Sequence, residues 1–114
     1  MHEYSLIQSL VARVEAEARA RRAVAIHRVV VKVGELSGVD PELFRTAYDT
    51  FRAGTLCASA ALEMRQVEAA WRCPACRRPI ERGAVLTCPT CGTPAALADD
   101  SDAIWLETIE MEVP

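Results

Sequence analysis

The chain has 114 residues, of which 51% are apolar, and its 13 basic and 16 acidic side chains give a net charge of −3. This composition excludes disorder over most of the length, and the size allows one compact core plus a small, separately stapled module. The acidic balance argues against a nucleic-acid-binding domain, which would be basic. No apolar stretch is long enough to span a bilayer, and the opening Met1-His2-Glu3 does not resemble a signal peptide.

A first helix is expected from about Ser5 to Arg22. Ser5 and Gln8 stand in capping-box spacing, and arginines at the far end suit the negative end of the helix dipole. Apolar residues recur with the helical period between them. They are Leu6, Ile7, Leu10, Val11 and Val14. Residues 1–3 are therefore expected just ahead of the helix.

A strand, a helix and a second strand are expected next. The segment 26–33 is rich in β-branched residues and predicts a central strand. Asp40-Pro41-Glu42 supplies an N-cap, a proline at the first helical position and an acid in the first turn of a helix that Gly54 ends. The segment 61–67 alternates apolar and charged residues and predicts the second strand. A strand–helix–strand connection predicts a right-handed crossover and a parallel pair.

The last third of the chain predicts a cysteine-rich module followed by a third strand. Trp71 marks the entry into the module, which extends to about Ala96. The acidic segment 99–102 predicts a solvated turn, and 104–113 predicts a strand that returns to the sheet. The expected fold is a small α/β (α+β) domain with two helices and a three-stranded mixed sheet, into which a zinc-ribbon-like module is inserted. The expected division is 1–69 with 97–114 for the first domain and 70–96 for the module.

Four cysteines stand in two C-P-x-C pairs, Cys73 with Cys76 and Cys88 with Cys91. Two such knuckles on either side of a loop are typical of a tetrahedral Cys₄ zinc site. Four thiolates without a carboxylate favour zinc, with iron as the weaker alternative. Four protein ligands leave no position for a reactive water, so the sequence predicts a structural rather than a catalytic metal.

The fifth cysteine and one of the two histidines have structural explanations. Cys57 has no partner in sequence and no adjoining histidine or basic cluster, so a small buried apolar role is expected rather than a reactive thiol. His27 falls early in the first predicted strand, where it is expected to face core or solvent rather than bind a metal.

The N-terminus offers a second candidate metal site. His2 directly follows the α-amine of Met1, so the amine, the His2 backbone nitrogen and the imidazole can close fused chelate rings around one ion. Glu3 adds a further backbone nitrogen and a carboxylate. Such a nitrogen-rich set suits nickel(II) or copper(II). A frayed terminal residue is the alternative for His2, and the N-cap role is a complete explanation for Asp40, which can also lend a carboxylate to a nearby metal.

No enzyme is indicated by the sequence. It contains no Ser-His-Asp pattern, no glycine-rich phosphate loop and no carboxylate pair with catalytic logic.

Three segments together resemble the HypA/HybF family, the nickel metallochaperones of [NiFe]-hydrogenase maturation. They are the opening MHEYSL of residues 1–6, the central GELSGVDPE of residues 34–42 and the paired C-P-x-C knuckles. The resemblance covers nearly the whole chain in the right order. It implies a small α/β domain with a zinc domain, in a cytoplasmic protein.

The resemblance also implies roles for particular residues and partners. His2 matches the essential nickel ligand, the Met1 amine and the backbone at Glu3 complete that site, and Asp40 matches a position where an acid has been implicated. Zinc is then held by Cys73, Cys76, Cys88 and Cys91. The implied partners are the nickel-handling GTPase of the pathway, the hydrogenase large-subunit precursor and, in some relatives, urease accessory proteins, with no nucleic acid and no membrane.

Two alternative functions stay open at this point. A zinc-ribbon nucleic-acid-binding or transcription-associated module would use the arginines near the knuckles and leave residues 1–3 idle. A purely structural zinc protein that binds a partner would take up no second metal.

Overall fold

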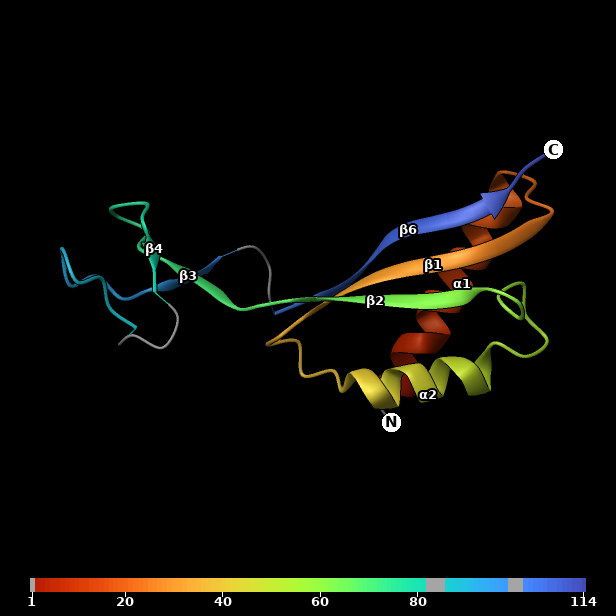
Figure 1. The fold of residues 1–114 in the computed structure, drawn as a ribbon, viewed down its shortest axis with the longest axis horizontal. Coiled ribbons are helices and arrows are strands. Elements are labelled where there is room, and N and C mark those ends of the chain that lie inside the picture. The colour runs from red at the N-terminus through yellow and green to blue at the C-terminus, as the bar shows by residue number, and fades with distance from the viewer. Residues whose placement is uncertain (1, 82–85, 99–101) are drawn as a thin grey trace.

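Residues 2–81, 86–98 and 102–114 are described by a computed structural model. Figure 1 shows an elongated molecule with a larger helix-and-sheet part and a smaller part that projects from one end of its sheet. The helices and strands are α1 (His2–Ala20), β1 (Ala25–Gly34), α2 (Pro41–Phe51), β2 (Ala61–Val67), β3 (Ala70–Arg72), β4 (Pro79–Ile80), β5 (Ala96–Ala98) and β6 (Ile104–Glu112).

The larger part contains a three-stranded mixed sheet in the order β2-β1-β6. β1 is parallel to β2, with Val31 opposite Met64, and antiparallel to β6, with Val31 opposite Leu106. The predicted central strand, the parallel pair and the returning last strand are therefore confirmed. The predicted fold class, two helices and a mixed three-stranded sheet with an inserted cysteine module, is also confirmed.

The start of α1 differs from the prediction. The helix begins at His2 and not at Ser5, so the capping-box assignment is wrong and residues 2 and 3 are helical. Glu3 lies in the first turn, where its charge suits the positive end of the dipole, and the exposed Ser5 is tolerated inside the helix. Met1 and residues 99–101 of the predicted turn lie outside the described residues.

The end of α1 is closed by backbone hydrogen bonds. The helix ends at Ala20, two residues before the expected Arg22. Ala23 N–H donates to Ala18 O and Arg22 N–H to Arg19 O, at 2.9 and 3.1 Å, which is the bond pattern of a Schellman motif. Arg22 takes the left-handed position, with φ of 54°, that is usually given to glycine.

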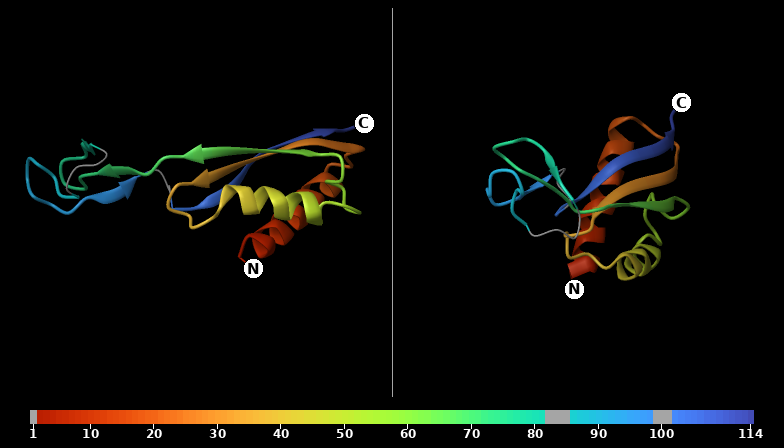
Figure 2. Two further views of the ribbon diagram at one scale, coloured as in Figure 1. Left: turned by 60° about the horizontal axis from the view of Figure 1, so that its bottom comes forward. Right: turned by 60° about the vertical axis from the view of Figure 1, so that its left-hand side comes forward.

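Both helices pack on one face of the mixed sheet, where they enclose the core (Figure 2). β1 contributes every second residue from Val29 to Val33 and also Ile26, which lies before a register irregularity, and the two helices contribute their apolar stripes. Asp40 caps α2 as predicted, because its Oδ1 accepts hydrogen bonds from Glu42 N at 2.9 Å and Leu43 N at 3.2 Å. The buried side chains are Ile7, Val11, Val14, Ala18, Ile26, Val29, Val31, Val33, Phe44, Tyr48, Cys57, Ala60 and Leu62.

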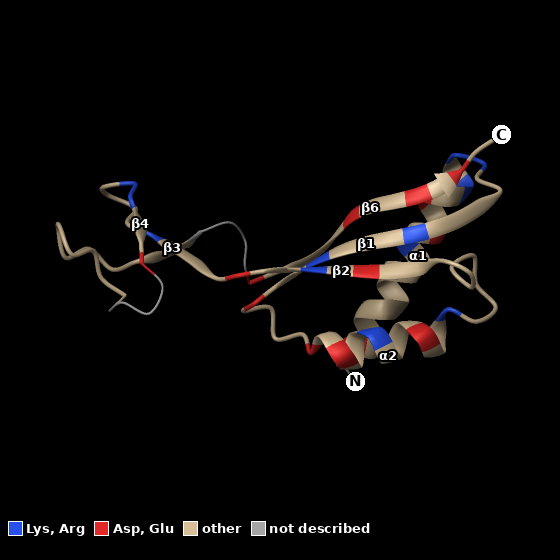
Figure 3. Ribbon diagram, viewed as in Figure 1, with Lys and Arg blue, Asp and Glu red and all other residues tan. Residues whose placement is uncertain are grey.

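The opposite face of this sheet is charged. Lysine, arginine and glutamate colours recur across β2, β1 and β6 in Figure 3. Arg28 at the centre pairs with Glu63 at 3.0 Å and also with Glu110, and Arg65 pairs with Glu107 at 3.5 Å. One side of the sheet therefore faces the core and the other faces solvent.

The smaller part contains a second sheet in the order β4-β3-β5, with both pairs antiparallel. It has its own small cluster of buried residues, Cys73, Ile80 and Cys88, against which Trp71 packs. β5 extends to Ala98 and leads back toward β6. No helix among the described residues is long and apolar enough to cross a membrane.

Candidate metal centre

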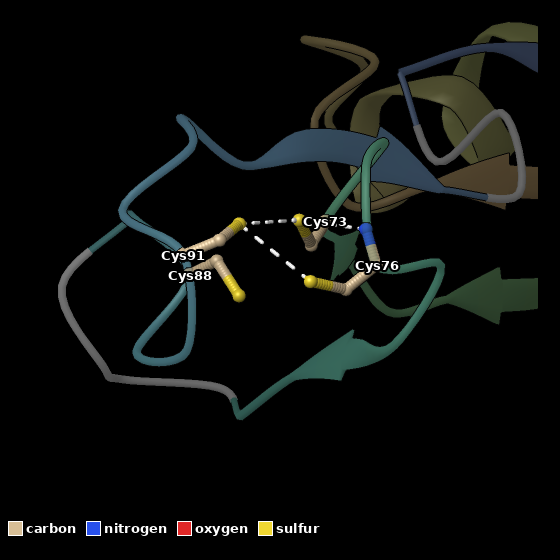
Figure 4. A group of neighbouring side chains, drawn as sticks. All are labelled: Cys73, Cys76, Cys88 and Cys91. Atoms are coloured by element: carbon tan, nitrogen blue, oxygen red, sulfur yellow. Dashed lines mark hydrogen bonds between the residues drawn. The ribbon is translucent and has the colours of Figure 1, made fainter.

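The four predicted zinc ligands converge in the smaller part. The sulfurs of Cys73, Cys76, Cys88 and Cys91 all lie within 4.8 Å of one another, and Figure 4 shows them turned toward a common point. Cys91 Sγ lies 3.6 Å from both Cys73 Sγ and Cys76 Sγ. A tetrahedron with zinc–sulfur bonds of about 2.3 Å has sulfurs about 3.8 Å apart. The four side chains can therefore bind a structural zinc ion with little rearrangement.

The two knuckles repeat the same backbone hydrogen bonds. Cys73 N–H donates to Arg78 O at 2.9 Å, and Cys88 N–H donates to Thr93 O at 2.8 Å. In each knuckle the residue after the second cysteine donates back to the first cysteine's carbonyl: Arg77 to Cys73 O, and Gly92 to Cys88 O, both at 2.8 Å. These paired bonds fix the two turns so that each presents two sulfurs to the same side.

Backbone N–H groups and a hydroxyl approach the sulfurs of the quartet. Cys76 N–H donates to Cys73 Sγ at 3.3 Å, and the Thr93 hydroxyl lies 3.0 Å from Cys91 Sγ. The hydroxyl and the backbone N–H of Thr93 lower the pKa of Cys91 to about 6. Thr93 was not singled out in the sequence, where its only signal is its place two residues after a knuckle cysteine.

The remaining thiols differ in their proton affinity. Backbone N–H groups at Cys91 and Thr90 lower the pKa of Cys88. Hydrogen bonding with the sulfur of Cys91, and secondly with that of Cys73, raises the pKa of Cys76 to about 12. The second knuckle, Cys88 with Cys91, therefore stabilises thiolates, whereas Cys76 retains its proton. A bound cation displaces this proton, because metals bind the thiolate form of cysteine.

The candidate nickel residues lie at the other part of the molecule. His2 is the first residue of α1, and Met1 lies outside the described residues. Glu3 Oε2 accepts a hydrogen bond from Asp40 N–H at 3.3 Å, so the structure brings the predicted residues Glu3 and Asp40 together. Both capping bonds of Asp40 go to its Oδ1.

His27 and Cys57 occupy structural positions. His27 is exposed on β1 and its Nε2 lies 3.3 Å from Glu112 Oε1, so it faces solvent. Cys57 is fully buried, as predicted, and burial raises the pKa of its thiol.

Comparisons with known proteins agree with this arrangement. The model of the HypA family, described as "Hydrogenase/urease nickel incorporation, metallochaperone, hypA", matches residues 1–111. The chain is 35% identical to the hydrogenase maturation factor HypA of Aquifex aeolicus, over 99% of both chains. It is 34% identical to that of Shewanella baltica strain OS185, over 98% of this chain and 97% of the relative.

Two solved structures share the fold. A solution structure of the nickel metallochaperone HypA from Helicobacter pylori has 31% identity, covers 98% of each chain and superposes with a TM-score of 0.73. A further solution structure of a HypA protein gives a TM-score of 0.81 at 31% identity, with 100% of this chain and 98% of the other covered.

The fold and the cysteine centre, with these matches, define a metallochaperone and not an enzyme. The chain belongs to the HypA family, whose members incorporate nickel during hydrogenase maturation. Family membership implies a second metal, nickel, which neither the nucleic-acid-binding nor the purely structural alternative includes.

Proposed function

We propose that this nickel metallochaperone binds Ni(II) at the start of α1. The ligands are the Met1 amine, the His2 imidazole and the backbone nitrogens of His2 and Glu3, with the Asp40 carboxylate as an auxiliary group. The observation that carries the proposal is the Glu3–Asp40 hydrogen bond of 3.3 Å, which sets the N-cap of α2 beside the first turn of α1.

The helical start of the chain supports this ligand set. The first backbone N–H groups of a helix have no acceptor within the helix, so the amide nitrogens of residues 2 and 3 are open to another partner. Nitrogen-rich sets suit the square-planar and tetragonal geometries of nickel(II) and not the tetrahedral preference of zinc. The imidazole must be neutral to bind, so affinity is expected to fall as pH drops through the ordinary histidine range near ~6.5.

The two metals have different roles in this proposal. Zinc stays in the cysteine centre and holds together the module of residues 70–96, whereas nickel is cargo of the domain formed by 1–69 and 97–114. Because all four zinc ligands come from the protein, the coordination shell of the zinc ion is complete and leaves no open position for exchange with a partner. Nickel leaves by ligand exchange with groups of the partner protein.

The family's role in hydrogenase and urease nickel incorporation implies partners in that pathway. We propose the nickel-handling GTPase and the hydrogenase large-subunit precursor as those partners, with urease accessory proteins as further ones. We also propose a cytoplasmic location, because five free thiols, four of them metal ligands, require a reducing compartment.

A nickel titration tests the proposed site. The zinc-loaded chain with its native terminus is compared with His2→Ala and with a form extended by a short N-terminal peptide, which blocks the amine and changes no side chain. His27→Ala, at the exposed histidine on β1, is the matched control. We expect one nickel site beyond zinc, weakened in His2→Ala and in the extended form and unchanged in the control. Unchanged nickel binding in either of the first two would contradict the proposal.

A further inference from the structure

β6 forms one edge of the mixed sheet. Its inner side pairs with β1, and among the described residues no strand pairs with its outer side. Figure 1 shows β6 along the margin of the sheet. An edge strand presents unpaired backbone N–H and C=O groups, which are a template for a further strand.

The core is incompletely covered beneath β6. Val33, Val31 and Val29 on β1 are 3%, 1% and 0% exposed. Their partners across the ladder are Ile104, Leu106 and Ile109, and all three stay only partly buried although they point to the same face. The helices therefore cover β1 more completely than they cover β6.

The uncovered region is a groove between α1 and β6. One hollow of about 200 Å³ is lined by Leu6, Leu10, Arg13, Ile104 and Leu106, among others. A second hollow of about 400 Å³ follows it and shares Arg13 and Leu106 with the first. The shared residues show that the two hollows are neighbours beside the free edge, and we call them together the groove, which is apolar in the first hollow and polar in the second.

The junction of the two hollows favours an acidic group in the occupant. The acids that line the polar end already have partners, since Glu17 pairs with Arg21 and Glu107 pairs with Lys32 and Arg65. Arg13 is exposed at the junction of the two hollows and forms no ion pair with any described residue. Arg21, at the polar end, is already paired with Glu17 at 3.6 Å. A carboxylate that enters beside the apolar hollow therefore finds one unpaired guanidinium, which can bind it in bidentate fashion.

We propose that this groove binds an extended segment of a partner polypeptide, which adds to β6 as a fourth strand. The β1–β6 register shifts between Val30 and Val31, opposite Glu107, so the regular segment beside the apolar hollow is 104–106. The added strand pairs with that segment, places an apolar side chain against Leu10 and Leu106, and presents a carboxylate to Arg13. Edge strand, helix and groove are the elements of strand-addition recognition.

A second copy of the chain is a poorer occupant. Its own β6 carries the exposed acids Glu107, Glu110 and Glu112 and would join an edge that carries the same three, so the two strands would have like charge, which is destabilising on adjacent strands. This interaction lies outside the proposed nickel site, so it can fail while the nickel proposal holds.

A displayed library of random ten-residue peptides, selected on the full-length zinc-loaded chain, supplies the probe. We expect enriched peptides to carry alternating β-branched residues and one acid. We expect their affinity to fall at least tenfold in Arg13→Glu and in Ser9→Trp, which fills the apolar hollow from the exposed face of α1. Arg19→Glu, an exposed arginine of the same helix outside the groove, is the matched control and should bind normally.

Backbone methylation of a selected peptide tests the binding mode. Strand addition uses the N–H groups on one edge of the peptide only, so N-methylating one alternate set of residues should abolish binding and methylating the other set should not. Amide exchange at residues 104–106 should slow on binding. The proposal would be overturned if no peptide were enriched, if the enriched peptides bound as helices, or if both methylated sets were tolerated equally. It would also be overturned if Arg19→Glu lost as much peptide affinity as Arg13→Glu, or if β6 were protected only through self-association of the chain. Circular dichroism, zinc content and nickel binding should be unchanged in Arg13→Glu.

Discussion

Arg77 and Gly92 occupy equivalent positions in the two knuckles, each directly after the second cysteine, with φ of 59° and 73°. Their N–H groups close the same turn, onto Cys73 O and Cys88 O. Glycine adopts this left-handed conformation freely, whereas other residues adopt it at a cost. The first knuckle therefore carries backbone strain that the second avoids.

Reciprocal substitutions measure this strain. Arg77→Gly should stabilise the zinc-loaded module by about 0.5 kcal/mol, because the gain in the turn exceeds the added freedom of the unfolded chain. Gly92→Ala should destabilise it by about 1 kcal/mol through backbone conformation alone, since a Cβ there meets nothing within 4 Å. Chelator competition for zinc and urea unfolding measure both. Equal stability of Gly92→Ala and the unsubstituted protein would contradict the argument, and Arg77→Ala, which keeps the strain, is the control.

Zinc removal should unfold the module and leave the helical domain folded. Apart from Ile80, the buried residues of the module's cluster are its own cysteines, whereas the larger core contains none of the four ligands. Without the metal, so few apolar side chains cannot hold the β4-β3-β5 sheet. Amide exchange after chelation should show protection lost in β3, β4 and β5 and kept in β1 and α1, and zinc should restore it. Simultaneous loss of protection in β1 would show that the two cores unfold together.

Thiol labelling follows from the same arrangement. After chelation the four ligand cysteines should react with an alkylating agent, while Cys57, which is fully buried in the larger core, stays protected. Addition of urea should expose the fifth thiol. Mass spectrometry of the labelled chain counts the adducts, and labelling of Cys57 before urea would contradict the independence of the two cores.

The sequence predicted the elements whose signals are local. Asp40 with Pro41 located the start of α2 because both act on adjacent backbone groups. The start of α1 was misplaced because Ser5 and Gln8 satisfy the capping pattern equally well inside a helix whose first turn holds Glu3. A local signature does not reveal that the chain is already helical before it.

Contacts between distant segments were beyond the sequence. The spacing of the cysteines predicted the quartet, yet nothing in it indicated that the Thr93 hydroxyl would approach Cys91. The hydrogen bond from Asp40 N–H to Glu3 joins the first turn of α1 to the cap of α2, and it depends on how the two helices pack. The groove beside β6 likewise depends on how the helices pack. The alternating apolar pattern of β6 does not reveal it, because a fully covered strand would show the same pattern.

The double role suggested for Asp40 can be separated by substitution. Asn caps a helix about as well as Asp, so Asp40→Asn should leave the free energy of unfolding nearly unchanged, whereas Asp40→Ala should cost about 1 kcal/mol. If the carboxylate assists nickel, both variants should bind nickel about two- to fivefold more weakly, a loss of about 0.5–1 kcal/mol. Calorimetric nickel titration beside urea unfolding provides both numbers. Glu42→Gln, another first-turn acid of α2, is the control, and full nickel affinity in Asp40→Asn would leave the residue a cap alone.

Alkaline pH should weaken the larger core through two buried groups. Burial raises the pKa of the Tyr48 hydroxyl to about 12 and raises the pKa of the Cys57 thiol. Their ordinary values are about 10 and 8.5, so above pH 8.5 the unfolded chain loses protons that the folded chain keeps. Stability is therefore fully present below about pH 8.5 and falls as pH rises toward 12, by up to about 1.4 kcal/mol per pH unit for each group.

Variants of the two residues should remove separate parts of this decline. Cys57→Ala should remove the part that begins near pH 8.5, and Tyr48→Phe the part that begins near pH 10. Tyr48→Phe should also cost about 1 kcal/mol at neutral pH, because the hydroxyl donates a 2.7 Å hydrogen bond to Ala60 O. That carbonyl keeps a second donor, Arg52 Nη1 at 2.8 Å, so the loss stays moderate. Urea unfolding followed by helical circular dichroism between pH 7.5 and 10.5 measures each slope, with Tyr4→Phe as the control. A flat wild-type profile over that range would mean that both groups titrate normally, despite their burial.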